Sequence, residues 1–139
     1  MKNLEIAKIF YEMADILEMQ DVQWKPRAYR KAARALESLS EDVEDIYKKK
    51  GLKGLEKIPG IGERLAKKIV QYIETGKINE YERLKKTLPP GLTEMMEVMG
   101  LGPKKVKVLY KKLKIKNIKE LEKAVSYTHL RAHETSLHL

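Results

Sequence analysis

Apolar residues recur at helical spacing along most of the chain. From Leu4 to Leu17 they return every three or four positions, and the same spacing reappears in the segments 26–36, 63–75 and 103–114. This period matches the 3.6 residues per turn of an amphipathic α-helix. No segment alternates between apolar and polar residues for long enough to predict a strand. The pattern therefore predicts an all-α protein built from short helices.

Capping residues mark the expected ends of the first helices. Asn3 is placed to cap the first helix, and Ser40 is placed to open a third helix that stops at Gly51. Between them, Pro26 occupies a first helical position, where a missing N–H costs nothing. Further along, Gly76 is expected to end the helix over 63–75.

The second half of the chain shows similar signals. Tyr81, Leu84 and Leu88 indicate one linking helix, and the Pro-Pro-Gly string at 89–91 terminates it. Asn117, with Glu120 three residues later, resembles a capping box for a last short helix.

A Gly-apolar-Gly turn occurs twice, at 60–62 and again forty residues later at 100–102. Glycine allows a sharp backbone turn, and the apolar residue between, Ile61 or Leu101, is expected to plug the turn into the core. The next helix then begins with unpaired N–H groups and the positive end of its dipole, which together favour a phosphate. We predict two helix-hairpin-helix units that bind the DNA backbone without reading bases; a purely structural pair of helix connections is the alternative. The residues expected to contact the DNA backbone are Gly60, Ile61, Gly62, Lys67, Gly100, Leu101, Gly102, Lys104 and Lys105.

Composition limits the classes of partner and of chemistry open to the chain. The 139 residues include 29 Lys and Arg against 20 Asp and Glu, a formal net charge of +9, which favours nucleic acid first and an anionic membrane surface second. No apolar run approaches the roughly 20 residues of a spanning helix, and no secretory leader begins the chain, so we expect a cytoplasmic protein with no membrane partner. The absence of cysteine excludes disulfides, thiolate nucleophiles and cysteine zinc sites.

The last fifteen residues differ from the rest, because residues 125–139 hold all three histidines. The string resembles the in-frame translation of a transposase adapter used in sequencing libraries, so we expect a non-native tail after residue 124. A metal site made by His129 and His133 is the alternative. It is disfavoured because two histidines without a suitably spaced carboxylate make a poor site.

Four strings together resemble the N-terminal region of family X DNA polymerases, the repair enzymes that include polymerase beta, and most of all the prokaryotic members. They are RAYRKAA at 27–33, IPGIG at 58–62, IETGKI at 73–78 and GLGPKK at 100–105. The resemblance covers residues 1–124. It implies a lyase-like domain with the first helix-hairpin-helix over 1–78, and a second helix-hairpin-helix subdomain over 79–124. In this family a palm with three aspartates binds Mg²⁺ for polymerisation, so we expect the chain to be an N-terminal piece that cannot polymerise by itself.

The resemblance implies a lyase site at Lys68. In the family, a lysine amine at this position attacks C1′ of a deoxyribose phosphate, forms a Schiff base and expels the 3′ phosphate by β-elimination. The amine must be neutral to attack, and Arg64, Lys67 and Lys25 are expected to lower its pKa by like-charge repulsion. The helical pattern gives the alternative, because Lys68 lies opposite the apolar face of its helix, where a solvated lysine is expected.

The resemblance also implies a pocket for a 5′-phosphate, formed by Lys25, Tyr29 and Arg64, with Trp24 stacking on a template base. Glu56 departs from the pattern, because the animal enzymes carry a pocket lysine there. Tyr29 has an alternative role as a core ring, since it shares a helix face with apolar residues. A monovalent cation, K⁺ or Na⁺, is implied at each hairpin when DNA is bound. Its ligands would be the backbone carbonyls of Glu56, Ile58 and Ile61 in the first turn, and of Met96, Val98 and Leu101 in the second.

These inferences together predict sequence-independent binding of gapped or nicked DNA by a monomer associated with a prokaryotic nucleoid, with 5′-deoxyribose phosphate lyase activity left open. The first alternative is a helix-hairpin-helix module of a recombination or repair protein that carries no chemistry. The second is an interaction module whose basic face meets protein or membrane.

Overall fold

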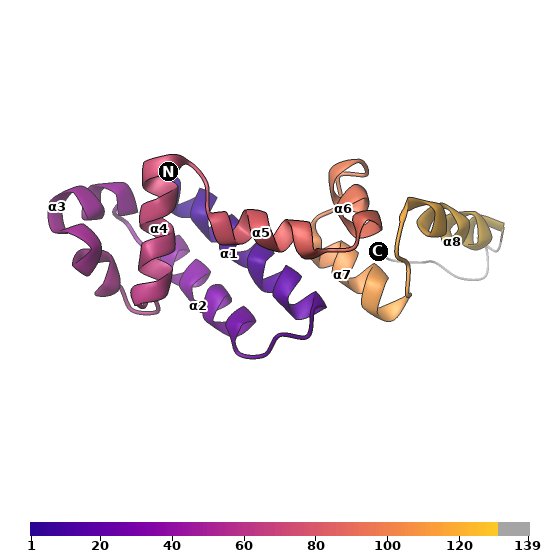
Figure 1. Cartoon of the computed structure of the whole chain (residues 1–139), viewed down its shortest axis with the longest axis horizontal. Coiled ribbons are helices and arrows are strands. Elements are labelled where there is room, and N and C mark those ends of the chain that lie inside the picture. The colour runs from indigo at the N-terminus through magenta and orange to yellow at the C-terminus, as the bar shows by residue number, and fades with distance from the viewer. Residues whose placement is uncertain (131–139) are drawn as a thin grey trace. The chain divides into compact units, whose positions relative to one another are not determined.

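The computed structural model of the chain describes residues 1–130, without the side chains of Glu97 and 125–130. This part is all helical and contains no strand, so the predicted fold class is confirmed. Its helices, shown in Figure 1, are α1 (Lys2–Met19), α2 (Lys25–Ser38), α3 (Val43–Glu56), α4 (Glu63–Thr75), α5 (Asn79–Thr87), α6 (Pro90–Glu97), α7 (Pro103–Lys112) and α8 (Ile118–Leu130). Among the described residues, no helix is long and apolar enough to cross a membrane.

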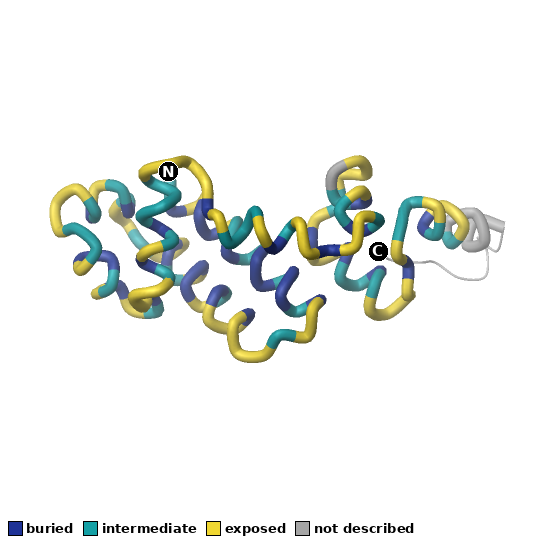
Figure 2. Tube along the Cα trace, viewed as in Figure 1, coloured by how far each residue is buried: buried dark blue, intermediate teal, exposed yellow. Residues whose placement is uncertain are grey.

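The chain divides into two compact units, Met1–Leu84 and Lys85–Leu139. In the first unit α1 packs along α2, and Figure 2 shows buried positions concentrated on these two helices. Phe10 and Ile16 of α1 are fully buried, as are Ala32 and Leu36 of α2. Small side chains such as Ala32 allow the two helix axes to approach closely. The α1–α2 pair therefore supplies much of the hydrophobic core of the first unit.

The sequence predicted that Asn3 caps the first helix, and this prediction is wrong. The helix begins at Lys2, with Met1 as its N-cap, and Asn3 lies inside it with 1% of its surface exposed. Its amide nitrogen donates to the Glu41 carbonyl at 2.8 Å, and its Oδ1 accepts from the Val43 N–H at 2.8 Å. The side chain therefore satisfies the start of α3 rather than the start of its own helix.

The start of α3 also corrects the expectation for Ser40. Asp42 is the N-cap, and its Oδ1 accepts from the Glu44 N–H at 2.8 Å. Gly51 breaks the helix as predicted, with φ +69° and ψ −162°, and a short second helical segment then runs to Glu56.

The turn between α3 and α4 follows the predicted hairpin. Ile61 is 3% exposed, so it plugs the turn into the core as expected. Gly60 has φ +95°, and a Cβ there would lie 3.4 Å from the Cβ of Ala35, so the hairpin approaches α2 closely. α4 ends at Gly76, whose left-handed conformation confirms the predicted stop.

The second unit repeats this hairpin between α6 and α7, with one difference. Gly100 has φ +68°, which gives the turn expected of a glycine. Leu101 is only half-buried, so the prediction that it plugs the turn into the core is only partly met. The apolar face of α7 is buried through Val106 and Leu109. The burial at this turn falls on Pro103 instead, because α7 begins there and turns that ring inward.

The predicted capping box opens α8. The Asn117 Oδ1 accepts from the Glu120 N–H at 2.8 Å, while Glu120 accepts from the Lys116 N–H at 3.1 Å. α8 continues to Leu130, six residues past the expected end of the native sequence. The His129 side chain and residues 131–139, His133 included, lie outside the described part, so the adapter-like tail and the histidine pair stay predictions.

Candidate nucleic-acid interface

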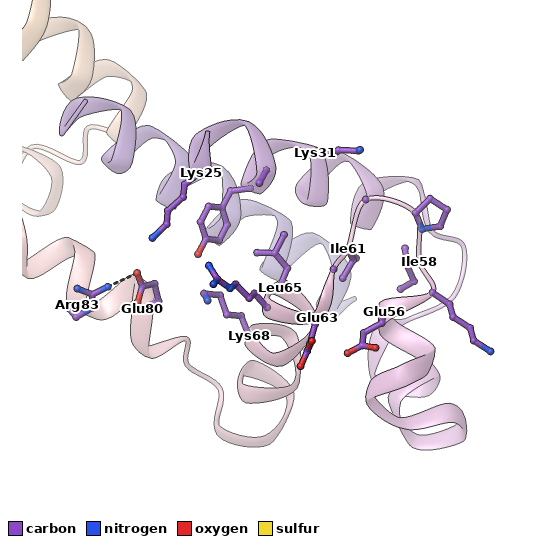
Figure 3. Close-up of a pocket in the computed structure, with 17 residues that line it drawn as sticks. Lys25, Lys31, Glu56, Ile58, Ile61, Glu63, Leu65, Lys68, Glu80 and Arg83 are labelled. Carbon is purple, nitrogen blue, oxygen red and sulfur yellow. Dashed lines mark hydrogen bonds and ion pairs between the residues drawn. The ribbon is translucent and has the colours of Figure 1, made fainter. Parts of the chain in front are cut away.

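A pocket of about 1020 Å³ opens on the first unit beside the hairpin. Its walls come from the start of α2, the turn before α4, the first half of α4 and the start of α5 (Figure 3). The residues expected at the lyase and 5′-phosphate sites all lie in its lining, namely Lys25, Tyr29, Arg64 and Lys68. The hairpin contributes its backbone through residues 58–62. The fold thus brings Lys25 and Lys68 to one pocket although they are 43 positions apart in the sequence.

Lys68 lies inside this pocket and is half-buried. It does project away from the apolar face of α4, but residues at the starts of α2 and α5 line the same pocket on that side. Burial lowers its pKa, the charges of Lys25, Arg64 and Arg83 lower it further, and Glu80 acts in the opposite direction. The expected like-charge repulsion is therefore present but secondary to burial. Lys67 takes no part and instead pairs with Glu63, with Nζ and Oε1 3.1 Å apart.

Tyr29 combines the two roles that the sequence left open. Its ring is buried, with 6% of the residue exposed, and it meets the ring of Phe10 edge to face, with centroids 5.4 Å apart. The residue also lines the pocket. Burial, together with the charge of Glu80, raises the pKa of Tyr29 to about 12 against the influence of Arg83. Its hydroxyl is consequently protonated at neutral pH and is available as a hydrogen-bond donor.

The other predicted contacts lie at the helix starts. Lys25 is the first residue of α2 and is exposed, and Arg64 is exposed in the first turn of α4. Trp24 immediately precedes α2, with 78% of its surface exposed and φ +72°, but it is not part of the pocket lining. An exposed ring held at the edge of a basic surface is free to stack on a base.

Among the lining residues that the sequence did not predict, Glu80 and Arg83 come from α5. Arg83 donates to the Glu80 carboxylate, and this bond, with the charges of Arg83, Lys68 and Lys25, lowers the pKa of Glu80 despite its partial burial. The sequence pattern of α5 predicted only a linking helix. The available signal was the opposite charge of Glu80 and Arg83 at i and i+3 in its first turns.

The first hairpin leaves backbone groups accessible. Gly62 caps α4 without any side-chain cap, and a Cβ placed on Gly62 would meet nothing within 4 Å. The Ile58 carbonyl accepts from the Ile61 N–H at 3.0 Å, which uses one of its two lone pairs. The described residues contain no cluster of three or more His, Cys, Asp or Glu able to hold a metal ion. Backbone carbonyl oxygens, in general, suit a hard ion such as K⁺ or Na⁺.

The second hairpin is basic but differently bonded. Lys104 and Lys105 are exposed in the first turn of α7. The Leu101 N–H bonds to the Met95 carbonyl at 3.4 Å, whereas the matching N–H of the first hairpin bonds to the carbonyl three residues back. α7 also begins with Pro103, which has no N–H to offer a phosphate. The two hairpins therefore share their glycines but not their hydrogen bonding.

Comparison with known proteins agrees with this geometry. Residues 1–78 match the family model described as a helix-hairpin-helix domain. The chain belongs to the helix-hairpin-helix domain family. The match spans the hairpin at 60–62 and the helices α1 to α4 that support the pocket.

Two relatives extend the helix-hairpin-helix match beyond residue 78. The chain is 34% identical over 129 residues to DNA polymerase/3′-5′ exonuclease PolX of Bacillus subtilis, covering 89% of this chain and 21% of that protein. It is 26% identical over 108 residues to DNA polymerase lambda of Rattus norvegicus, covering 78% of this chain and 18% of that protein. The resemblance to family X DNA polymerases is thereby confirmed. The chain spans about a fifth of the length of these curated relatives.

Proposed function

We propose that this helix-hairpin-helix chain binds gapped or nicked DNA through its phosphates, as the N-terminal part of a family X DNA repair polymerase associated with the nucleoid. The 5′-phosphate at the gap would enter the pocket, and the hairpin backbone and the start of α4 would face the neighbouring phosphates. The second hairpin, with Lys104 and Lys105, would hold the duplex on the other side of the gap. None of these contacts reads a base, so the binding would be independent of sequence.

The convergence of cations in one pocket is the observation that carries this proposal. Lys25 from α2, Arg64 and Lys68 from α4, and Arg83 from α5 all line the same cavity next to the hairpin turn. Lysines on a solvated helix face point in many directions, whereas these groups surround one space. A phosphate dianion is the small ligand that best matches several convergent cations and a protonated tyrosine hydroxyl.

Fluorescence anisotropy tests this binding. We expect the 139-residue chain to bind a gapped duplex more tightly than an intact duplex of the same sequence, and to bind two unrelated gapped sequences equally. Affinity should fall steeply with salt, because phosphate neutralisation releases counterions. Lys25→Gln should weaken gapped binding by about threefold to tenfold, whereas Lys8→Gln, an exposed lysine of α1 outside the pocket, should not. Equal effects of the two variants would contradict a role for the pocket.

A lyase activity at Lys68 is the second candidate, and a specific observation favours it. Lys68 is half-buried beside the proposed phosphate site, and its lowered pKa increases the fraction of neutral amine. A neutral amine can add to the C1′ aldehyde of a 5′-deoxyribose phosphate and lose water to give a Schiff base. Loss of a C2′ proton then expels the 3′ phosphate. The sugar stays attached to the lysine until water hydrolyses the Schiff base.

Borohydride trapping separates this activity from a module that only binds. Reduction of the Schiff base should give a covalent adduct between the chain and DNA that bears a 5′-deoxyribose phosphate. We expect Lys68→Ala to abolish the adduct even at protein concentrations that saturate the gapped DNA. Lys67→Ala is the matched control, because Lys67 is the adjacent lysine of α4 and lies outside the pocket. An unchanged adduct in Lys68→Ala would exclude this residue as the nucleophile.

A monovalent cation is proposed at each hairpin when DNA is bound. The carbonyls of Glu56, Ile58 and Ile61 would hold it in the first turn, and those of Met96, Val98 and Leu101 in the second. Such an ion would supply a positive charge between backbone carbonyls and a DNA phosphate. Replacing K⁺ by tetramethylammonium at constant ionic strength should then weaken binding, because the larger ion does not fit between the carbonyls.

A further inference from the structure

The proposed phosphate pocket contains a carboxylate at the end where its cations gather. Figure 3 shows the ammonium groups of Lys25 and Lys68 directed toward the end of the pocket occupied by Glu80 and Arg83. Two other carboxylates line the pocket, Glu56 and Glu63, but Figure 3 shows both on the hairpin side, and Glu63 is already paired with Lys67. Glu80 is therefore the acidic residue placed among the cations that a phosphate would need.

Glu80 is also held in position. Arg83, three residues later on α5, donates to its Oε1, and the Glu80 side chain is only 25% exposed. Arg83 itself is 64% exposed on its side chain, so it can change partner without leaving the solvent. A carboxylate that is partly buried and fixed by a neighbour presents its charge to the pocket in a defined place.

We propose that Glu80 is the internal counter-ion of this pocket and competes with an incoming 5′-phosphate for Lys25, Lys68 and Arg83. This inference rests on the proposed function, because it assigns a regulating residue to the same site. When phosphate enters, Arg83 exchanges its bond to Glu80 for a bond to the phosphate. Glu80 thereby sets how strongly the empty pocket attracts anions, and it favours ligands whose charge exceeds its own.

The electrostatics of Lys68 agree with this placement. The charged groups that act on Lys68 come from three helices, namely Lys25 of α2, Arg64 of α4, and Glu80 and Arg83 of α5. Burial and the three cations lower its pKa, and Glu80 alone raises it. Glu80 consequently keeps more of Lys68 in the charged form, which binds phosphate but cannot attack an aldehyde. The same residue would restrain both binding and chemistry.

Two variants of α5 are expected to act in opposite directions. Glu80→Gln removes the competing charge, so the affinity for a gapped duplex with a 5′-phosphate should rise by about twofold to fivefold, the size of a partly exposed charge pair. Arg83→Gln removes a phosphate partner and releases Glu80 toward Lys68, so the same affinity should fall by a similar factor. A gain on removing a residue from a binding site is not expected of a purely structural helix-start carboxylate.

The test measures binding and the Lys68 amine separately on the full 139-residue chain. Anisotropy compares wild type, Glu80→Gln and Arg83→Gln on gapped duplexes with a 5′-phosphate or a 5′-hydroxyl. Glu82→Gln serves as the control, because it makes the same charge change on α5 outside the pocket lining. Nitrogen-detected NMR titration then gives the pKa of the Lys68 Nζ directly. We expect this pKa to fall in Glu80→Gln, to rise in Arg83→Gln and to stay unchanged in Glu82→Gln, with all variants folded by circular dichroism.

The outcomes separate this inference from the proposed function. If wild type prefers the 5′-phosphate and Glu80→Gln binds it no more tightly, Glu80 is not a competing counter-ion and the inference fails while the pocket assignment stands. If wild type shows no such preference, the phosphate pocket itself fails. The Lys68 titration then decides alone whether Glu80 acts on the pocket cations, and an unchanged pKa in Glu80→Gln overturns the inference.

Discussion

The ring of Tyr29 packs edge to face against the ring of Phe10, with an interplanar angle of 65°. Phe10 is fully buried in α1, so this contact joins the pocket wall to the central helix pair of the first unit. Aromatic pairs of this geometry add stability beyond the apolar area they bury. The position of the Tyr29 hydroxyl in the pocket therefore depends on core packing.

Substitutions at Tyr29 should separate these two roles. Tyr29→Phe keeps the ring and removes the hydroxyl, so unfolding free energy should change by less than about 0.5 kcal/mol while 5′-phosphate affinity falls about threefold to tenfold. Tyr29→Ala should also cost about 3 kcal/mol of stability, because it leaves a cavity against Phe10. Urea denaturation and anisotropy measure the two effects. A large stability loss in Tyr29→Phe would show that the hydroxyl is a structural group.

The two glycines of the first hairpin should respond differently to alanine. Gly60→Ala forces a side chain into φ +95° against α2, so it should destabilise the chain by about 1–2 kcal/mol. Gly62 has φ −92° and ψ −175°, which alanine adopts readily, and its missing Cβ faces open space. Gly62→Ala should therefore leave stability unchanged but weaken DNA binding, because the new methyl stands where the backbone would approach a phosphate. Urea denaturation with anisotropy distinguishes the pair, and equal stability losses would contradict this geometry.

Asn3 should matter for stability and not for binding. Asn3→Ala removes both hydrogen bonds to the 41–43 turn and leaves the buried Val43 N–H unpaired, which should cost about 2 kcal/mol. Lys8→Ala, an exposed change on the same helix, should cost less than about 0.5 kcal/mol. Under conditions where both proteins are folded, their affinities for gapped DNA should match wild type. A binding defect in folded Asn3→Ala would mean that the α1–α3 junction influences the pocket.

The lyase proposal predicts a specific pH dependence. Because the Lys68 pKa is lowered, its amine should become fully neutral at a lower pH than that of an ordinary lysine, whose pKa is 10.5. Trapping rates at saturating protein should therefore rise with pH and level off once the amine is neutral. Arg64→Gln removes a like charge, so it should raise the Lys68 pKa and move the profile to higher pH. Single-turnover borohydride trapping across pH measures this. A profile that moves to lower pH in Arg64→Gln would contradict the assigned electrostatics.

The sequence predicted the helices and hairpins well because their signals are local. Gly51, Gly76 and the capping pair Asn117 and Glu120 act within a few residues of their own positions, and all behave as expected. Asn3 was misassigned because its partners lie about 40 residues away, and a capping preference does not reveal whose helix start is being capped. The prediction that Ser40 opens α3 was wrong for a related reason, since Ser40 and Asp42 are both good caps and lie two residues apart.

The site was only partly visible in the sequence. Lys25, Tyr29, Arg64 and Lys68 could be named because the resemblance to family X DNA polymerases implies them, and the structure brings them to one pocket. Glu80 and Arg83 belong to no motif. Their importance comes from the start of α5 reaching the pocket that α2 and α4 also line, which no local pattern encodes. The burial of Lys68 has the same origin, because the helical pattern of α4 alone places it toward solvent.

The most direct test of this account is the affinity of the full chain for a one-nucleotide gapped duplex with a 5′-phosphate, compared with the same duplex bearing a 5′-hydroxyl. At matched salt the phosphorylated gap should bind about tenfold more tightly, since several cations and the Tyr29 hydroxyl would contact that group. The preference should disappear when Lys25 and Arg64 are both changed to Gln. Equal affinity of wild type for the two duplexes would contradict the assignment of the pocket to a 5′-phosphate.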